Sequence, residues 1–117
     1  MTFKRHLLAG LAAAVLAVQA PAHAAPLEFD DATVAELQAA MQAGTLSSEK
    51  LIELCLARIQ AYDARGPKLH AVMALNPKAL EQAKALDAER KAKGPRSPLH
   101  GIPVVFKDNF DTFDMPT

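Results

Sequence analysis

An unbroken apolar run near the C-terminus constrains the fold of this chain more than any other feature. Residues Ile102 to Phe106 are all apolar and do not alternate with polar residues. This pattern is typical of a strand that is covered on both faces, as in the inner part of a mostly parallel sheet. Such a strand needs neighbouring strands for its backbone hydrogen bonds and cannot stand alone. We therefore predict a strand over 102–106 that lies in the inner part of a mostly parallel sheet.

A lysine ends this apolar run. Lys107 is followed by Asp108 and Asn109, so an amine emerges where the predicted strand meets a polar loop. In open sheets with parallel strands, ligand sites lie beyond the carboxyl ends of the strands. A lysine beside an aspartate in a turn is more often a hydrated pair than a catalytic group. Spacing alone therefore favours a solvated lysine over a catalytic one.

Upstream of this run, two helices are predicted. Thr33 and Glu36 form a T-x-x-E capping box for a short helix that ends at Gly44. Ser47 or Ser48 can cap the next helix, whose apolar positions recur at spacings of one, three and four. Those positions are Leu51, Ile52, Cys55, Leu56, Ile59 and Tyr62. We expect Cys55, the single cysteine, to be a buried apolar residue that forms no internal disulfide.

A second strand and a third helix follow a predicted loop over 63–68. The segment 69–75 is mostly apolar and too short for a helix, which favours a strand. Asn76 is positioned to cap a helix that has Pro77 at its first position and ends before Gly94. Its apolar stripe is narrow: Leu80, Ala83 and Leu86.

The N-terminus has the layout of a signal peptide. Lys4 and Arg5 precede an uncharged apolar run over 7–18, and an A-x-A pattern predicts cleavage after Ala24. A helix of that length spans roughly 18 Å, short of the roughly 30 Å hydrocarbon core, so no permanent membrane anchor is expected. We predict an exported protein, periplasmic or secreted, with a leader over 1–24 and a mature chain over 25–117.

Charge and spacing argue against several partners. The mature chain would carry eleven basic and thirteen acidic side chains, and a balance near neutral predicts no nucleic-acid partner. Basic residues crowd the end of the third helix, where cations suit the helix dipole. No metal site and no cofactor are expected, because the aspartates at 108, 111 and 114 lack calcium-loop spacing and His70 and His100 lack zinc-site spacing.

One segment of the chain carries a specific family motif: Pro98-Leu99-His100-Gly101-Ile102-Pro103-Val104-Val105-Phe106-Lys107-Asp108-Asn109. It resembles the part of the amidase signature family that carries the catalytic lysine. The resemblance covers residues 31–117, and residues 66–77 are most similar to secreted bacterial amidases of the peptide-amidase type. It implies the first part of a mixed-sheet α/β domain that hydrolyses carboxamide bonds of small-molecule or peptide substrates. The implied mechanism is a Ser-cisSer-Lys triad.

Within this resemblance, Lys107 matches the catalytic lysine, and Asp108 and Asn109 match neighbours that would orient it. His100 belongs to the turn motif and is expected to be structural. The family's bridging serine and nucleophile lie downstream of the matched segment, and the three serines of this chain have none of the expected surroundings. We therefore expect residues 25–117 to be an N-terminal portion of an amidase domain that is inactive alone. We also expect Lys107 to stay protonated and exposed, since a lysine base must be desolvated by surrounding structure.

Two alternatives remain open. The chain could be a short exported helical protein without catalytic activity, whose uncovered apolar strand binds a partner. Alternatively, it could resemble family members that release ammonia from glutamine for charging transfer RNA. Those proteins work in the cytoplasm, so the predicted signal peptide argues against that role.

Overall fold

The structure of the chain is a computed structural model that describes residues 31–113 and 115. Three α-helices and one π-helical segment make up its regular structure: α1 (Val34–Gln42), α2 (Ser48–Arg58), η1 (Ile59–Ala64) and α3 (Ala79–Lys93). None of the helices in this described part is long and apolar enough to cross a membrane. The predicted leader over 1–24 and its cleavage site lie outside the described residues.

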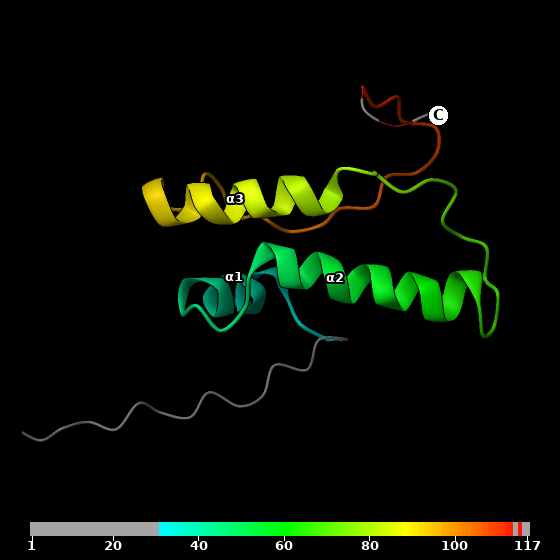
Figure 1. Cartoon of the computed structure of the whole chain (residues 1–117), viewed down its shortest axis with the longest axis horizontal. Coiled ribbons are helices and arrows are strands. Elements are labelled where there is room, and N and C mark those ends of the chain that lie inside the picture. The colour runs from blue at the N-terminus through cyan, green and yellow to red at the C-terminus, as the bar shows by residue number, and fades with distance from the viewer. Residues whose placement is uncertain (1–30, 114, 116–117) are drawn as a thin grey trace, which may run out of the picture.

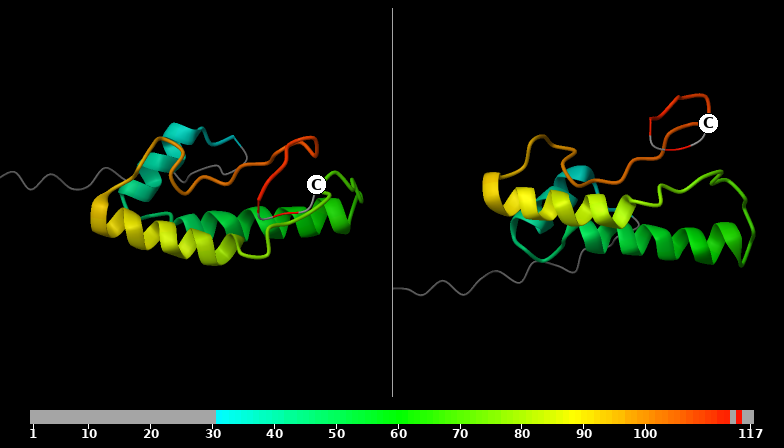
Figure 2. Two further views of the ribbon diagram at one scale, coloured as in Figure 1. Left: turned by 90° about the horizontal axis from the view of Figure 1, so that it is seen from above. Right: turned by 45° about the horizontal axis from the view of Figure 1, so that its top comes forward.

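The helices form a small layered arrangement. Helices α2 and α3 lie side by side and run in opposite directions, and α1 packs beside the start of α2 (Figures 1 and 2). Helix η1 continues directly from α2, so the second predicted helix extends to Ala64 and takes up the first residues of the predicted loop. The segment after α3 turns back and runs along α3 toward the C-terminus (Figure 1).

The predicted capping residues of the first two helices are confirmed. The Thr33 hydroxyl accepts a hydrogen bond from the Glu36 backbone N–H at 3.2 Å, and the Glu36 carboxylate accepts one from the Thr33 N–H at 2.8 Å. Of the two candidate serines, Ser47 caps α2, because its hydroxyl accepts from the Lys50 N–H at 3.0 Å. Ser48 is instead fully buried. Local sequence was sufficient to identify both helix starts.

Helix α3 begins two residues later than predicted. The Asn76 side chain accepts a hydrogen bond from the Lys78 N–H at 2.8 Å, so it stabilises a turn over 76–79 that leads into the helix. The helix then runs from Ala79 to Lys93, and Gly94 closes it as expected with a φ of 79°. The predicted start at Pro77 is therefore wrong, although Asn76 still satisfies a backbone donor just before the helix.

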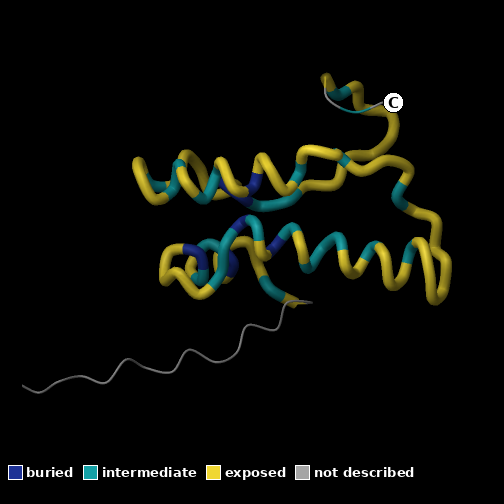
Figure 3. The backbone as a smooth tube through the Cα atoms, viewed as in Figure 1, coloured by how far each residue is buried: buried dark blue, intermediate teal, exposed yellow. Residues whose placement is uncertain are grey.

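The core is small and lies where α1, α2 and α3 meet (Figure 3). Leu37, Met41 and Leu51 form one buried apolar cluster, and Ala83 is buried on α3. Cys55 and Ile102 pack against the cluster but stay partly exposed. Cys55 is therefore less buried than predicted, and it is a free thiol.

The predicted strand over 69–75 is absent. Backbone groups of this segment bond instead to the end of η1: the Leu69 N–H donates to the Tyr62 carbonyl at 3.2 Å and the Ala71 N–H to the Asp63 carboxylate at 2.5 Å. A helix C-terminus has carbonyls without intrahelical partners, and the segment satisfies some of them. The apolar residues that suggested a strand, such as Leu69 and Met73, are largely exposed.

The predicted strand over 102–106 is also absent, so the described part of the chain is helical and the α/β prediction is not met within it. The segment is irregular, and Val104, Val105 and Phe106 are 55%, 88% and 57% exposed. A strand requires a neighbouring strand to complete its hydrogen bonds. The described residues supply helices, whose backbone groups are already paired within each helix, and therefore offer no edge for it to join.

Candidate functional site

Lys107 lies in an exposed turn at the end of the irregular apolar segment. The Phe110 N–H donates to the Lys107 carbonyl at 3.0 Å, and the Phe106 and Phe110 rings pack across the turn with centroids 6.3 Å apart. Asp108 and Asn109 form the middle of this turn and are exposed. Within the described residues neither side chain hydrogen-bonds the Lys107 amine. Their predicted orienting role therefore stays a prediction, and the exposure expected for Lys107 is observed.

The turn over 98–101, which precedes this segment, is anchored by a buried histidine. His100 is 4% exposed, and its Nδ1 accepts a hydrogen bond from the Arg96 N–H at 3.2 Å. Its Nε2 lies 2.9 Å from the Leu86 carbonyl on α3. Because a carbonyl can only accept, Nε2 must carry the proton, which defines the tautomer of a neutral ring. The structural role predicted for His100 is confirmed.

Two side chains converge on the backbone carbonyl of His100. Gln38 Nε2 donates to it at 2.9 Å from α1, and Arg90 Nη2 donates to it at 2.8 Å from α3. The two side chains also contact each other, since Arg90 Nη2 donates to Gln38 Oε1 at 2.7 Å. This triangle, which we call the carbonyl clamp, ties α1, α3 and the 98–101 turn together.

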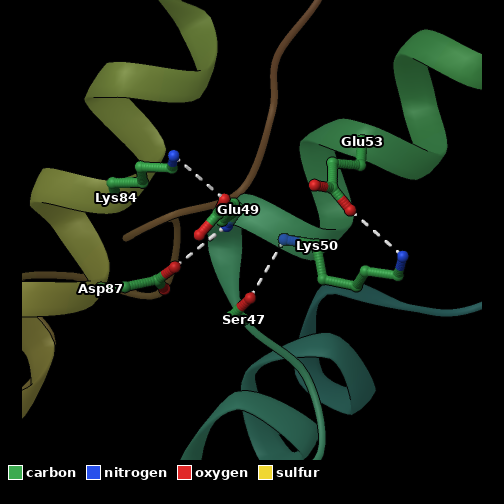
Figure 4. A network of polar contacts seen from close by, with 6 residues as sticks. All are labelled: Ser47, Glu49, Lys50, Glu53, Lys84 and Asp87. Atoms are coloured by element: carbon green, nitrogen blue, oxygen red, sulfur yellow. Dashed lines mark hydrogen bonds and ion pairs between the residues drawn. The ribbon is translucent and has the colours of Figure 1, made fainter.

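A polar contact between helices fixes the start of α2. Asp87 points from α3 to the N-terminus of α2, where its carboxylate accepts from the Ser48 N–H at 2.7 Å. It also accepts from the Glu49 N–H at 3.0 Å (Figure 4). The Lys84 amine lies 3.3 Å from the Glu49 carboxylate beside it. A carboxylate at a helix N-terminus satisfies free N–H groups and complements the helix dipole.

Gln38, Asp87 and Arg90 were not predicted from the sequence. A signal for two of them was available, because Asp87 and Arg90 lie four and seven residues after Ala83. That spacing places both charges on the helix face that carries the apolar stripe. Charged residues on a predicted buried face indicate polar contacts to another element. Gln38 had no comparable signal beyond its position three residues before the buried Met41.

The serines of the described chain are all engaged in structural contacts. The Ser47 hydroxyl caps α2, the Ser48 hydroxyl points at Met41 Sδ at 3.9 Å, and the Ser97 hydroxyl accepts from the Leu99 N–H at 3.3 Å. None of the three hydroxyls hydrogen-bonds Lys107 in the part of the chain that the structure describes. No group of three or more potential metal ligands occurs among these residues either.

The comparison with protein families identifies the chain. The model of the amidase family matches residues 50–117, more than half of the sequence and the whole Lys107 segment. The chain belongs to the amidase family. Amidase relatives match over a longer region: a Schizosaccharomyces pombe protein assigned as an amidase is 40% identical over 88 residues, which cover 75% of this chain and 15% of the relative.

A second amidase-family relative is a glutamyl-tRNA(Gln) amidotransferase component of Thermobifida fusca. It is 43% identical over 86 residues, which cover 73% of this chain and 17% of that protein. The chain thus spans less than a fifth of the length of these curated relatives.

Among solved structures, the chain is similar to peptide amidase. The native enzyme of Stenotrophomonas maltophilia shares 47% identity with a TM-score of 0.73, over 77% of this chain and 18% of that one. A peptide amidase bound to the competitive inhibitor chymostatin gives the same TM-score at 46% identity, over 76% of this chain and 18% of that one. The helices described above therefore follow the path of the corresponding part of an amidase fold.

Proposed function

We propose that this chain is the N-terminal portion of an amidase that hydrolyses carboxamide C–N bonds, with Lys107 as its catalytic lysine. The supporting observation is that the family match over 50–117 includes the turn and segment that carry Lys107. The anchored 98–101 turn and the exposed amine also support this proposal. They fit a lysine that is positioned by this turn and acts together with catalytic groups outside the described residues. Asp108 and Asn109 are proposed to orient this lysine once the site is complete.

The proposed reaction is acyl transfer to serine and then to water. A serine oxygen attacks the amide carbon while Lys107, acting through a bridging serine, takes the hydroxyl proton. The C–N bond then breaks, and the nitrogen leaves with a proton from the same relay. Water hydrolyses the resulting ester. We infer that both serines come from the part of the family's domain that this chain does not span.

Desolvation of the Lys107 amine is the second contribution that we assign to the part of the family's domain that this chain does not span. A lysine that acts as a general base must be in its neutral form, and burial away from water favours that form. Lys107 is exposed here. We therefore infer that residues 1–117 alone do not turn over amides. Detectable amidase activity of the purified chain would contradict this inference.

For the substrate, we favour peptide amides. Two observations support this choice. The chain is 46% and 47% identical to two peptide amidase structures, and one of those structures contains the competitive inhibitor chymostatin. The amidotransferase relatives support a second candidate, release of ammonia from glutamine. Export, inferred from the 1–24 leader, favours the first candidate, because the second serves transfer RNA charging in the cytoplasm. Edman sequencing of the exported protein would test this leader by looking for Ala25 at its N-terminus.

A graft onto the Stenotrophomonas peptide amidase tests the function. Residues 31–113 of this chain would replace the corresponding segment of that enzyme, and ammonia release from peptide amides and from glutamine would be measured. We expect activity on peptide amides that Lys107→Met abolishes while the fold, followed by circular dichroism, is unchanged. A folded graft in which Lys107→Met keeps full activity would rule out the proposed role of the lysine.

A further inference from the structure

The carbonyl clamp uses the full accepting capacity of one peptide group. A carbonyl oxygen has two lone pairs, and that of His100 receives one hydrogen bond from Gln38 at 2.9 Å and one from Arg90 at 2.8 Å. The two donors come from helices that are far apart in sequence, and they are joined to each other at 2.7 Å. The plane of the 100–101 peptide is therefore held from two directions.

Arg90 forms its hydrogen bonds without a carboxylate partner among the described residues. Its guanidinium reaches uncharged acceptors, namely two amide oxygens and the Met41 sulfur at 3.5 Å. Its Nε is buried and has no hydrogen-bond partner among the described residues. Buried polar groups are normally paired, so an unpaired one calls for an explanation. The neighbouring basic residues Lys91 and Lys93 are exposed.

The clamp lies directly upstream of the Lys107 segment. Gly101 is buried, and Ile102 packs against the core cluster, while the chain from Val104 to Lys107 is exposed. Lys107 follows Ile102 by about five residues, a reach of at most about 18 Å. The described contacts that hold this segment to the helices are therefore concentrated at residues 100–102. A rotation of the 100–101 peptide would swing the exposed part, including the lysine.

We propose that Arg90 and Gln38 are positioning residues for Lys107: by saturating the His100 carbonyl they set the direction in which the Lys107 segment leaves the helices. This inference rests on the proposed function of Lys107. Neither residue is expected to touch substrate. Their effect is on the placement of the amine, and misplacement of a catalytic group by about 1 Å can lower a rate on the order of 100-fold.

The first test uses the full 117-residue chain and needs no activity. Backbone order parameters from ¹⁵N relaxation would be compared for Arg90→Met, Gln38→Met and the control Lys91→Met, an exposed basic residue of the same helix turn. We expect values at Gly101 and Ile102 to fall from about 0.85 toward about 0.6 in the two clamp variants and to be unchanged in the control. Unchanged values in both clamp variants would overturn the inference.

The second test uses the active peptide-amidase graft. Arg90→Met and Gln38→Met should each lower kcat about 10- to 100-fold with KM changed by less than about twofold, because substrate binding does not involve the clamp. The double variant should lose no more than the stronger single variant, since the two residues act as one unit. Lys91→Met should keep the kcat of the parent graft.

The outcomes separate the two proposals. In the first outcome, Lys107→Met abolishes activity, while both clamp variants are folded by circular dichroism and keep the kcat of the control. The positioning role is then overturned, and the proposed function stands. If Lys107→Met stays active, the proposed function fails, and the order parameters alone decide whether the clamp sets the segment. Should Arg90→Met fail to fold, Gln38→Met gives the same comparison, because Gln38 is partly exposed at the α1 surface.

Discussion

Gly101 lies against Ser48 so closely that a β-carbon at position 101 would overlap the Ser48 hydroxyl oxygen and come within 3.0 Å of the Ser48 β-carbon. Gly101 also has a φ of +78°, a conformation that residues with a side chain adopt at a cost. The turn that leads to Lys107 is thus seated directly on the N-terminus of α2. Two independent requirements, space and backbone conformation, call for glycine there.

Replacement of Gly101 by alanine should therefore destabilise the chain strongly. Gly44→Ala is the matched control, because Gly44 has a similar φ of +74° but nothing lies within 4 Å of the place that a β-carbon would occupy. We expect a loss of about 1–2 kcal/mol for the control from backbone strain alone. Gly101→Ala should lose about 2–5 kcal/mol, because overpacking adds to the strain. Urea denaturation would measure both, and equal losses would show that the contact with Ser48 is unimportant.

The Asp87 carboxylate should contribute more to stability than the local cap of the same helix. Asp87→Ala removes two charge-assisted hydrogen bonds from the start of α2 and should cost about 1.5–3 kcal/mol. Ser47→Ala removes one neutral capping bond and should cost about 1 kcal/mol. Thermal unfolding of the two variants gives the comparison. A smaller loss for Asp87→Ala would mean that water replaces the carboxylate at the helix end.

The capping box of α1 predicts a pH effect. Hydrogen bonds from the Thr33 backbone N–H and then from its hydroxyl lower the pKa of Glu36 from its usual 4.5. Because the folded-state pKa is the lower one, the stabilisation is fully present above pH 4.5 and is lost as pH falls through the folded-state pKa. Thr33→Ala should move the NMR titration midpoint of Glu36 only part of the way back, since the backbone bond remains. An unchanged midpoint would exclude the hydroxyl as a cause.

Cys55 should react slowly with alkylating reagents. Burial against the core raises the pKa of its thiol, and the nearby Arg58 guanidinium opposes this rise only partly. Since the thiolate is the nucleophile, less of it is present near neutral pH than for a free cysteine. The rate of alkylation by iodoacetamide should be lower in the folded chain than in the chain unfolded in urea. As pH rises, the rate for folded Cys55 should also level off at a higher pH than the rate for a free thiol. Equal rates in both states would contradict the prediction.

Lys107→Met should leave the stability of the 117-residue chain nearly unchanged. The amine is exposed and makes no hydrogen bond among the described residues, so its removal should shift the free energy of unfolding by no more than about 0.5 kcal/mol. Chemical denaturation would show this. A loss above about 1 kcal/mol would indicate that the lysine supports the fold of this chain, and would weaken its assignment as a residue held for catalysis.

The parts of the fold that depend on local interactions were predictable. The capping box of Thr33 and Glu36, the cap at Ser47 and the stop at Gly94 follow from hydrogen bonds between residues a few positions apart. Leu51, which is buried in the core, belongs to the predicted apolar pattern of the second helix, and recognising that pattern also needs no knowledge of distant residues.

The sequence by itself determined the three helices, the family resemblance and the position of Lys107 at the end of an apolar segment. Only the tertiary structure decided that this segment is not a strand here, because a strand depends on neighbours that local residues cannot supply. It also decided that Asp87 caps another helix and that Arg90 meets Gln38 at the His100 carbonyl. Those contacts join groups 39 and 52 residues apart, and their partners are set by helix packing rather than by sequence pattern.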